Sequence, residues 1–449
     1  MTAPHPQRDP AAVCFITFGC QMNKLDSELA AGEFLRRGLS TTTDPDRAGT
    51  ILINTCSVRR HAEQRALSRL GRFKRAKQQC PELVLVVMGC MAQKDGRRLL
   101  DTVPHLDVVC GTKHFADLPA LVEQARSEGA RLCVTDDAPV TFDRCPSARP
   151  DRHRAFVSVM RGCNSFCSYC IVPYVRGREV SRPPGDVVDE VRRLVDDGCV
   201  EITLLGQNVD AYHHEAADLA ALLERVDAVD GLRRLRFVTS HPKDISPRLL
   251  RAIAGLPRVC EHLHMPAQSG STRILRAMNR GYTAERYREI VASARETVPQ
   301  IEIASDFIVG FPGETDEDFA ASAALIRECE FNQSFIFKYS PREGTRAARL
   351  DDDIPQAAKR ERNQALLAVQ EEVSRARQAA KEGRTVEVLV DGPSKRDASR
   401  LTGRTRGHDI VVFPEPTERA VGPGDIVHIR ITESTPLTLF GEIQAGPPA

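Results

Sequence analysis

The stretch "RGCNSFCSYCIVPYVRG", residues 161–177, places Cys163, Cys167 and Cys170 at C-x3-C-x2-C spacing. Closely spaced thiols bind zinc or an iron–sulfur cluster, and both kinds of site take about four ligands. The next cysteine, Cys199, lies beyond a predicted helix. The three thiols therefore predict a metal or cluster site whose fourth position is open to water or to a substrate.

Three more cysteines each end a short apolar run near the N-terminus. Cys20, Cys56 and Cys90 close "VCFITFGC", "TILINTC" and "LVLVVMGC", and each run precedes a helix-like stretch. This alternation predicts a parallel sheet, which binds ligands at the carboxyl ends of its strands. We expect the three thiols to converge at that edge, although buried strand-end thiols are also common. Cys110 ends a fourth run without the same turn residues, and the sequence leaves its role open.

A second series of strand and helix patterns must position the C-x3-C-x2-C loop. Residues 156–345 hold six strand-like runs, from "AFVSVM" to "SFIFKYS", which alternate with helix-like stretches such as "PGDVVDEVRRLVDDG". Six such repeats predict a partial parallel (βα)6 barrel with its site at the carboxyl ends of the strands. The loop follows the first of these strands, so we expect it at that end.

The chain, at 449 residues, is too long for one hydrophobic core, and its patterns divide it into modules. We expect an open parallel α/β domain over 12–127, a linker over 128–148 and the partial barrel domain over 149–380. Short alternating strands with Gly/Pro turns predict a small antiparallel β-barrel over 382–445. The charged residues 346–380 indicate a long connecting helix that is exposed to solvent.

Composition limits the location and partners of the chain. Lys+Arg 62 against Asp+Glu 61 gives a net charge of +1, so any nucleic-acid surface must come from local patches. The polar N-terminus and the lack of a long apolar run predict a cytoplasmic chain with no membrane segment. In that reducing compartment, 14 cysteines favour metal or cofactor ligation over disulfides.

Two basic stretches could contact the phosphates of a nucleic acid. Residues 59–79 carry eight Lys/Arg and one Glu, although a solvated charged helix face explains them equally well. The second stretch, "KRDASRLTGRTRG", supplies the candidate RNA-binding residues Lys395, Arg396, Arg400, Arg404 and Arg406.

The cysteine loop within a parallel barrel resembles the radical S-adenosylmethionine superfamily. Residues 13–445 as a whole are similar to the methylthiotransferase family, whose last module is a TRAM domain. "TFGCQMNKLDSE", "NTCSVRRHAEQRA" and "RGCNSFCSYCIVPYVRGREVSRP" resemble its tRNA-modifying, MiaB-type branch. The chain departs from that branch at "HMPAQSGS" and at Glu343 and Arg346, where prolines are often found.

The resemblance implies two 4Fe–4S clusters and S-adenosyl-L-methionine as cofactors. Cys163, Cys167 and Cys170 would hold the cluster that binds S-adenosylmethionine through its free iron. Cys20, Cys56 and Cys90 would hold an auxiliary cluster that carries the transferred sulfur, and no catalytic side chain is implied beyond these six ligands. The candidate contacts to S-adenosylmethionine are Gly206, Gln207, Asn208, Ser240, Asp306 and Ile308.

The implied reaction adds a methylthio group to carbon 2 of N6-(dimethylallyl)adenosine at position 37 of tRNA. That carbon bears an unactivated C–H bond, so the cofactor must supply the difficult chemistry. The implied partners are a tRNA anticodon stem-loop and an electron donor of the flavodoxin or ferredoxin type. We expect a monomer.

Three alternatives stay open at this point. A related branch modifies threonylcarbamoyl-adenosine in tRNA. Another modifies a ribosomal-protein aspartate, and "GCQMN" and "IVPYVRG" argue against it. A zinc-structured RNA-binding protein without catalysis is the third, and an iron and sulfide assay separates it from both enzymes.

Overall fold

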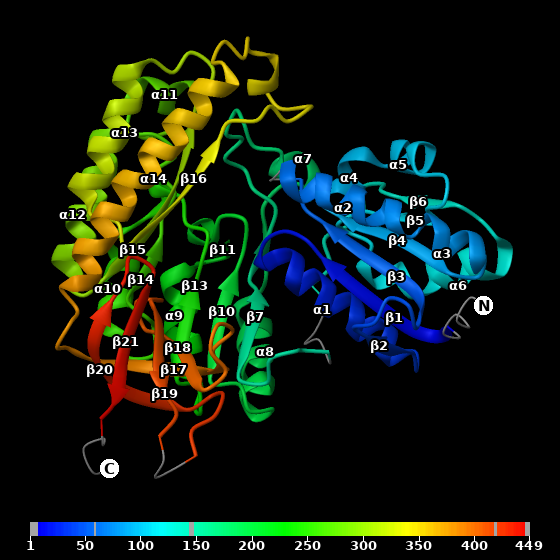
Figure 1. Ribbon diagram of the computed structural model, residues 1–449, viewed down its shortest axis with the longest axis horizontal. Helices are drawn as coiled ribbons and strands as arrows, with labels where there is room; N and C mark the ends of the chain where they lie inside the picture. Colours follow the sequence, from blue (N-terminus) through cyan, green and yellow to red (C-terminus); the bar gives the residue numbers. More distant parts are fainter. Residues whose placement is uncertain (1–7, 58–59, 143–147, 417–419, 445–449) are drawn as a thin grey trace.

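The computed structural model describes residues 8–57, 60–142, 148–416 and 420–444. Arg59 of the first basic stretch, residues 143–147 of the expected linker and residue 445 of the expected last module lie outside the described residues. Three modules lie along the chain, and the middle one contacts both of the others (Figure 1). In the described part of the chain, no helix is both long enough and apolar enough to cross a membrane.

The N-terminal module is a parallel sheet with helices on both faces, as predicted. Its strand order is β2-β1-β3-β4-β5-β6. Helices α1 and α6 cover one face, whereas α2, α3 and α5 cover the other. The strands are β1 (Asp9–Thr17), β2 (Ser40–Thr42), β3 (Ala48–Thr55), β4 (Val84–Gly89), β5 (Val108–Cys110) and β6 (Leu132–Val134). The helices are α1 (Gln21–Arg36), α2 (Arg60–Arg72), α3 (Lys74–Gln79), α4 (Cys90–Asp95), α5 (Arg97–Thr102) and α6 (Leu118–Glu128).

The middle module is the expected partial barrel, with six parallel strands in two groups. The first sheet has the order β13-β10-β7 and the second β14-β15-β16, and an isolated bridge between Leu235 and Val259 joins them. The strands are β7 (Arg154–Ser158), β10 (Glu201–Leu205), β13 (Arg234–Phe237), β14 (His262–His264), β15 (Glu302–Val309) and β16 (Gln333–Lys338). The surrounding helices are α8 (Pro184–Asp196), α9 (Leu219–Asp227), α10 (Pro247–Gly255), α11 (Thr272–Ala277), α12 (Ala284–Thr297) and α13 (Asp316–Cys329).

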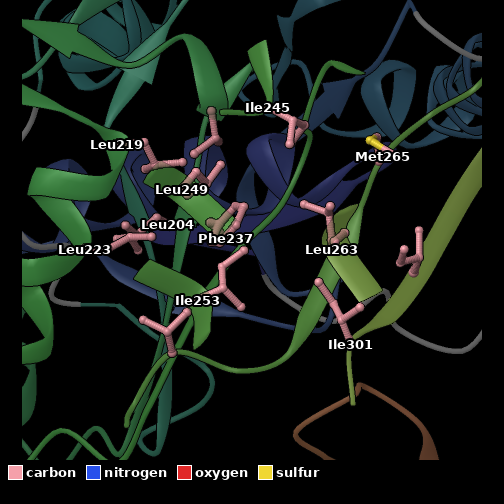
Figure 2. Close-up of a cluster of buried hydrophobic side chains, with 14 of the residues drawn as sticks. Leu204, Leu219, Leu223, Phe237, Ile245, Leu249, Ile253, Leu263, Met265 and Ile301 are labelled. Carbon is pink, nitrogen blue, oxygen red and sulfur yellow. The ribbon is translucent and has the colours of Figure 1, made fainter. Parts of the chain in front are cut away.

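The core of this module lies between the strands and the outer helices. Figure 2 shows Leu204 and Phe237 of the sheet against side chains of α9 and α10. Helix α10 begins where Ser246 accepts a hydrogen bond from the Leu249 N–H, with Pro247 at the first helical position. Both features are strong helix-start signals, and they aim the apolar face of α10 at the strands.

Short elements connect the strands of the middle module. They are β8 (Met160–Arg161), α7 (Val172–Arg176), β9 (Val180–Ser181), β11 (His213–His214) and β12 (Ala217–Asp218). Helix α7 begins two residues after Cys170 and lies beside α4 of the N-terminal module. It therefore forms part of the junction between the two modules.

The expectation of a solvated helix over 346–380 is wrong in one respect. The chain does form the long helix α14 (Gln356–Ala379), but one side of it packs on α13 and β16. Leu366 is fully buried, and the Gln370 side chain donates to the Phe331 carbonyl at 2.9 Å. Polar residues can lie on this face because they form hydrogen bonds to backbone groups beneath them. The charge of the segment does not show such bonds, so it led to the prediction of an exposed helix.

The C-terminal module is a closed five-stranded barrel. Its strands are β17 (Thr385–Pro393), β18 (Arg400–Thr405), β19 (Ile410–Pro414), β20 (Ile426–Ser434) and β21 (Thr438–Ile443). The prediction of an antiparallel barrel holds for every neighbouring pair except β19–β21, which is parallel. Because an odd number of strands cannot alternate in direction around a closed ring, one parallel pair is unavoidable.

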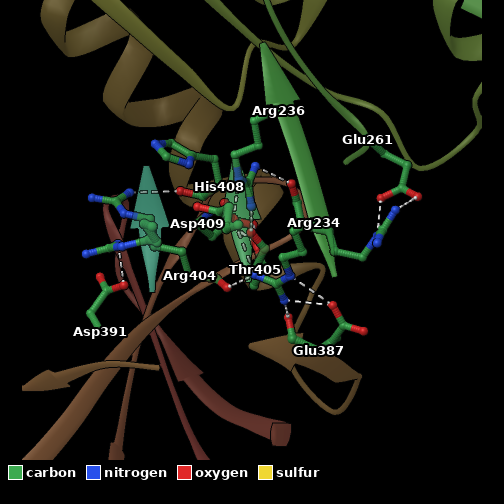
Figure 3. A network of polar contacts seen from close by, with 12 residues as sticks. Arg234, Arg236, Glu261, Glu387, Asp391, Arg404, Thr405, His408 and Asp409 are labelled. Carbon is green, nitrogen blue, oxygen red and sulfur yellow. Dashed lines mark hydrogen bonds and ion pairs between the residues drawn. The ribbon is translucent and has the colours of Figure 1, made fainter. Parts of the chain in front are cut away.

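Partly buried ion pairs attach this barrel to the amino ends of the middle module's strands (Figure 3). Arg234, the first residue of β13, binds Glu387 at 2.8 Å and the Arg404 carbonyl at 2.8 Å. Arg406 binds Glu261 at 2.7 Å. The C-terminal barrel therefore lies at the opposite end of the strands from the cysteine loop.

Candidate functional site

The structure places Cys20, Cys56 and Cys90 at one edge of the N-terminal sheet. They follow β1, β3 and β4, which are neighbours, and the register pairs Thr17 with Asn54 and Thr55 with Gly89. The strands therefore end at a similar height, and the residues after them meet. Gly19 lies so close to Cys56 that a Cβ on it would be 2.6 Å from the Cys56 Cβ, and its φ of +130° also favours glycine.

Asparagine side chains fix the turns that carry these thiols. Asn23 donates to the Asn54 side chain at 2.9 Å and to the Thr55 carbonyl at 3.0 Å. Asn23 also accepts a hydrogen bond from the Cys20 thiol at 3.2 Å. The sequence motif contains both asparagines, but their role as buried supports was not predicted.

The electrostatic environment favours the thiolate form of Cys20. A hydrogen bond from Cys56 lowers the pKa of Cys20 to about 6, and the Arg176 cation acts in the same direction. Since the thiolate is the metal-binding form of cysteine, Cys20 is ready to act as a ligand near neutral pH.

Cys110 does not share this environment. Its thiol is buried, donates to the His114 carbonyl at 3.3 Å, and packs in the cluster on the α1 and α6 side of the sheet. Burial raises the pKa of Cys110 far above its ordinary value. It therefore has the surroundings of a structural thiol.

The loop with Cys163, Cys167 and Cys170 follows β7 and the short strand β8, at the carboxyl end of β7. The Cys163 N–H donates to the Gly177 carbonyl at 3.1 Å, and the Ser168 N–H donates to the Met278 carbonyl at 2.9 Å. At Gly162 φ is +82°, and a Cβ there would overlap the Arg178 carbonyl. These bonds and this close approach hold the loop in one shape.

The three loop thiols influence one another. Burial raises the pKa of Cys170 to about 12, and the neighbouring Cys167 and Cys163 add to the effect. Arg280, a buried residue, donates to the Cys167 sulfur at 3.4 Å and to the Pro266 carbonyl at 2.8 Å. Burial opposes ionisation of Cys163 and Cys170, and a bound metal would supply the positive charge that offsets this effect.

Helix α7 joins the two cysteine groups. Ile171 and Val175 pack against Cys90, so the residue that follows Cys170 touches a cysteine of the other module. Arg176 at the end of α7 binds Asp26 of α1 at 2.7 Å, and both side chains are buried. Arg161 lies 3.6 Å from the other oxygen of Asp26. Sequence reasoning did not assign a role to Asp26, Arg161 or Arg176.

The residues after β10 support the cysteine loop. Gly206 packs closely on Met160, and the Gln207 side-chain oxygen accepts a hydrogen bond from the Gly162 N–H. Asn208 donates to Asp244 at 2.7 Å. In the described part of the chain, the Gln207 amide nitrogen and the Asn208 amide oxygen are buried without hydrogen-bond partners. Such orphaned groups indicate a polar ligand at this point.

The other three candidate cofactor contacts lie just after β13 or within β15. Ser240 donates to Asp210 at 3.0 Å, and Asp306 lies 3.1 Å from His264. Ile308 packs with Ile274 and Phe311. Residue 240 follows β13, whereas Asp306 and Ile308 lie within β15. The intervening strand β14 links them, since the Ser240 N–H donates to the His264 carbonyl at 3.2 Å.

His241 is a buried residue that sequence reasoning missed. Its Nδ1 accepts from the Lys243 N–H at 3.3 Å, and burial lowers the pKa of His241 to about 2, so the ring is neutral. Its Nε2 then carries hydrogen and has no partner within the described residues. The motif "SHPKDIS" contains this histidine and was the only signal for it.

The five candidate RNA-binding residues separate into two groups. Lys395, Arg396 and Arg400 are exposed. Arg406 instead pairs with Glu261, and Arg404 donates to the His408 carbonyl beside the middle module. Figure 3 shows Arg404 within this interface. Two of the four guanidinium groups among these residues are therefore engaged inside the protein.

Each of the two cysteine groups contributes three thiols. Among the described residues, no three His, Cys, Asp or Glu side chains are gathered as for one metal ion. The resemblance to the radical S-adenosylmethionine superfamily and the methylthiotransferases implies instead a 4Fe–4S cluster on each group of three thiols.

Comparison with known proteins agrees with this arrangement. The family described as "Uncharacterized protein family UPF0004" matches residues 12–111, the "Radical SAM superfamily" matches 157–326, and the "TRAM domain" matches 379–443. The tRNA-2-methylthio-N(6)-dimethylallyladenosine synthase of Moorella thermoacetica is 43% identical over 96% of this chain and 98% of the relative. The chain belongs to this synthase family. A synthase of the same name from Burkholderia thailandensis is 43% identical over 95% of this chain and 96% of its own length.

Solved structures support the fold of the family. The radical S-adenosylmethionine methyltransferase TsrM from Kitasatospora setae has a TM-score of 0.56 at 14% identity, over 75% of this chain and 77% of that chain. The cobalamin-dependent S-adenosylmethionine radical enzyme OxsB has a TM-score of 0.52 at 10% identity, over 75% of this chain and 54% of that chain. At these identities the likeness concerns the fold alone.

Proposed function

We propose that this chain is a tRNA methylthiotransferase that converts N6-(dimethylallyl)adenosine at position 37 to its 2-methylthio derivative. The observation that carries the proposal is the meeting of two cysteine groups across α7, with Ile171 and Val175 against Cys90. A reaction that moves sulfur to an unactivated carbon needs a radical source and a sulfur source close together. The names of the relatives give 2-methylthio-N(6)-dimethylallyladenosine of tRNA as the product, and membership of their family supports the same reaction for this chain.

The cofactors are two 4Fe–4S clusters and S-adenosyl-L-methionine. Cys20, Cys56 and Cys90 would hold one cluster, and the three loop cysteines would hold the other. When bound, these groups supply a radical that removes hydrogen from the C–H bond and a methylated sulfur that replaces it. The orphaned amides of Gln207 and Asn208 would contact the polar end of S-adenosylmethionine.

The protein's own residues hold these groups in place and exclude water. Arg280 donates to the Cys167 sulfur at 3.4 Å, and the charge of Arg176 beside Cys90 opposes the rise in the pKa of Cys90 that burial causes. The bond from Gly162 to Gln207 fixes the loop over the end of β10. Ile171 and Val175 fill the space between the two groups with apolar side chains, which keeps solvent out of that space.

The partners follow from the reaction. The substrate is a tRNA anticodon stem-loop, whose loop bases leave the stack at modest cost to reach a barrel mouth. Reductive cleavage requires a one-electron donor of the flavodoxin or ferredoxin type. The chain would act as a monomer in the cytoplasm, where tRNA is modified.

The test compares tRNA nucleosides from cells that lack the gene with those from complemented cells, by mass spectrometry. We expect 2-methylthio-N6-(dimethylallyl)adenosine to vanish without the gene and its unthiolated precursor to accumulate. Complementation with Cys163→Ser should fail, whereas Cys80→Ser, a half-buried thiol outside both groups, should restore the product. Loss of the methylthio form of threonylcarbamoyl-adenosine, or of a methylthio mass on a ribosomal protein, would assign the chain to another branch.

An iron and sulfide assay on anaerobically reconstituted protein checks the cofactors. Two clusters imply about eight irons per chain, and a Cys163→Ser variant should retain about four. Zinc with little iron would contradict both enzyme assignments.

A further inference from the structure

One face of α2 carries three arginines that the proposed site does not use. Arg65, Arg69 and Arg72 recur at spacings of four and three residues, so they lie along one side of the helix. Together with Ile16 and Phe18 near the end of β1, they line an open hollow of about 480 Å³. Phe18, which lines the hollow, lies two residues before Cys20 in the sequence.

The positive charge of this hollow is uncompensated. In the described part of the chain, none of the ion pairs includes Arg65, Arg69 or Arg72. The sole acidic residue of α2, Glu63, is already bound to Lys94 at 2.6 Å and lies 3.6 Å from Arg342. A hollow with three unpaired guanidinium groups attracts a ligand with several negative charges.

Aromatic rings hold two of these guanidinium groups. Arg65 lies over the ring of Phe18 at 5.3 Å, and Arg69 lies over the ring of Phe73 at 5.5 Å. Stacking restricts the side chains in advance and leaves their N–H edges available for bidentate bonds to phosphate. The arrangement is therefore partly organised before a ligand binds.

The spacing of the arginines suits a nucleic-acid strand. Seven residues of helix cover about 10 Å, and the phosphates of one duplex strand recur about every 3.4 Å along its axis. The three arginines are therefore spread over a length that holds about three to four such phosphates. The amino end of α2 meets Arg342 of the barrel through Glu63, so a strand in the hollow leads toward the mouth of the barrel.

We propose that Arg65, Arg69 and Arg72 bind consecutive backbone phosphates of the substrate RNA beside the cysteine site. The inference rests on the proposed function and adds to it a docking surface on the N-terminal module. These contacts position the RNA strand and carry no sequence information.

The test is a salt titration of RNA binding to the full, cluster-loaded chain. A fluorescently labelled anticodon stem-loop is titrated anaerobically at several salt concentrations, with anisotropy as the readout. Each Arg→Ala change should reduce the slope of log affinity against log salt by about 1, and the triple change by about 3. At 0.15 M salt we expect the triple variant to bind at least ~10-fold more weakly. Arg37→Ala, an exposed arginine at the end of α1 on the opposite face of the sheet, should leave both quantities unchanged.

The outcomes separate the two proposals. Wild-type chain that does not bind the stem-loop contradicts the proposed function. Wild-type binding with an unchanged slope in the triple variant overturns the docking surface alone. The RNA-docking proposal is also contradicted if the triple variant binds RNA normally but accepts electrons more slowly from reduced flavodoxin. The arginine face would then bind an acidic electron-transfer protein. A triple Arg→Lys variant keeps the charge, so it should retain the slope while losing affinity through the missing bidentate bonds.

Discussion

At the residue scale, the buried pair of Asp26 and Arg176 connects the two cysteine groups. Both side chains are at most 5% exposed, and the oxygen–nitrogen distance is 2.7 Å. Asp26→Leu leaves the Arg176 charge buried without its carboxylate and should destabilise the protein by about 3–5 kcal/mol. Arg176→Met leaves Asp26 with Arg161 at 3.6 Å, so it should destabilise the protein by less. The double variant should lose less than the sum of the two, as measured by urea unfolding of the chain.

An exposed pair of the same residue types provides the control. Arg192 and Asp189 are 3.0 Å apart, but their side chains are 61% and 59% exposed. Arg192→Ala should therefore change the free energy of unfolding by less than about 1 kcal/mol. Equal effects at the two pairs would mean that burial does not control the strength of the Asp26–Arg176 interaction.

The same residues show which parts of the site the sequence could predict. Each cysteine was found because it ends an apolar run or belongs to a tight local spacing. Asp26 and Arg176 were missed because their partnership spans 150 residues and depends on how two modules dock. Arg404 and Arg406 were predicted to bind RNA because they belong to a basic stretch. The sequence does not show that their side chains bond within the interface between two modules.

At the element scale, strand and helix periodicity predicted all six strands of the partial barrel. In the N-terminal module it missed the edge strands β2 and β6, because three residues give too short a pattern. It also misjudged the exposure of α14. Along that helix, buried polar residues such as Gln370 and Ser374 interrupt the apolar stripe, so the packed face looks solvated in the sequence.

Two adjacent leucines test the packing of α14. Leu366 is fully buried, whereas Leu367 is 45% exposed. Leu366→Ala should destabilise the protein by about 2–5 kcal/mol through lost burial and a residual cavity. Leu367→Ala should change stability by about 0.5 kcal/mol or less. Thermal unfolding of the two variants beside wild type measures both, and equal shifts would contradict a packed face on α14.

At the scale of the whole molecule, two candidate RNA surfaces lie toward opposite ends of the middle module. The arginines of α2 lie near the carboxyl ends of its strands, while Lys395, Arg396 and Arg400 belong to the barrel at the amino ends. An RNA that contacts both must extend along the side of the middle module. One RNA can contact both surfaces in a single orientation only if the C-terminal barrel keeps a fixed position on the middle module.

Arg234 should be the main determinant of that fixed position. Its side chain is fully buried and binds Glu387 and the Arg404 carbonyl across the junction. In Arg234→Met the carbonyl loses a donor and Glu387 loses its partner, so local opening of the junction becomes more favourable. We expect faster backbone amide exchange in β17 and β18, measured by hydrogen–deuterium exchange, with exchange in β3 and β4 unchanged. Arg430→Met, at an exposed position on β20, should leave all four strands as in wild type. If Arg234→Met also leaves β17 and β18 unchanged, the remaining contacts of the network, such as Lys381 with Glu302 and Asp409, hold the barrel without it.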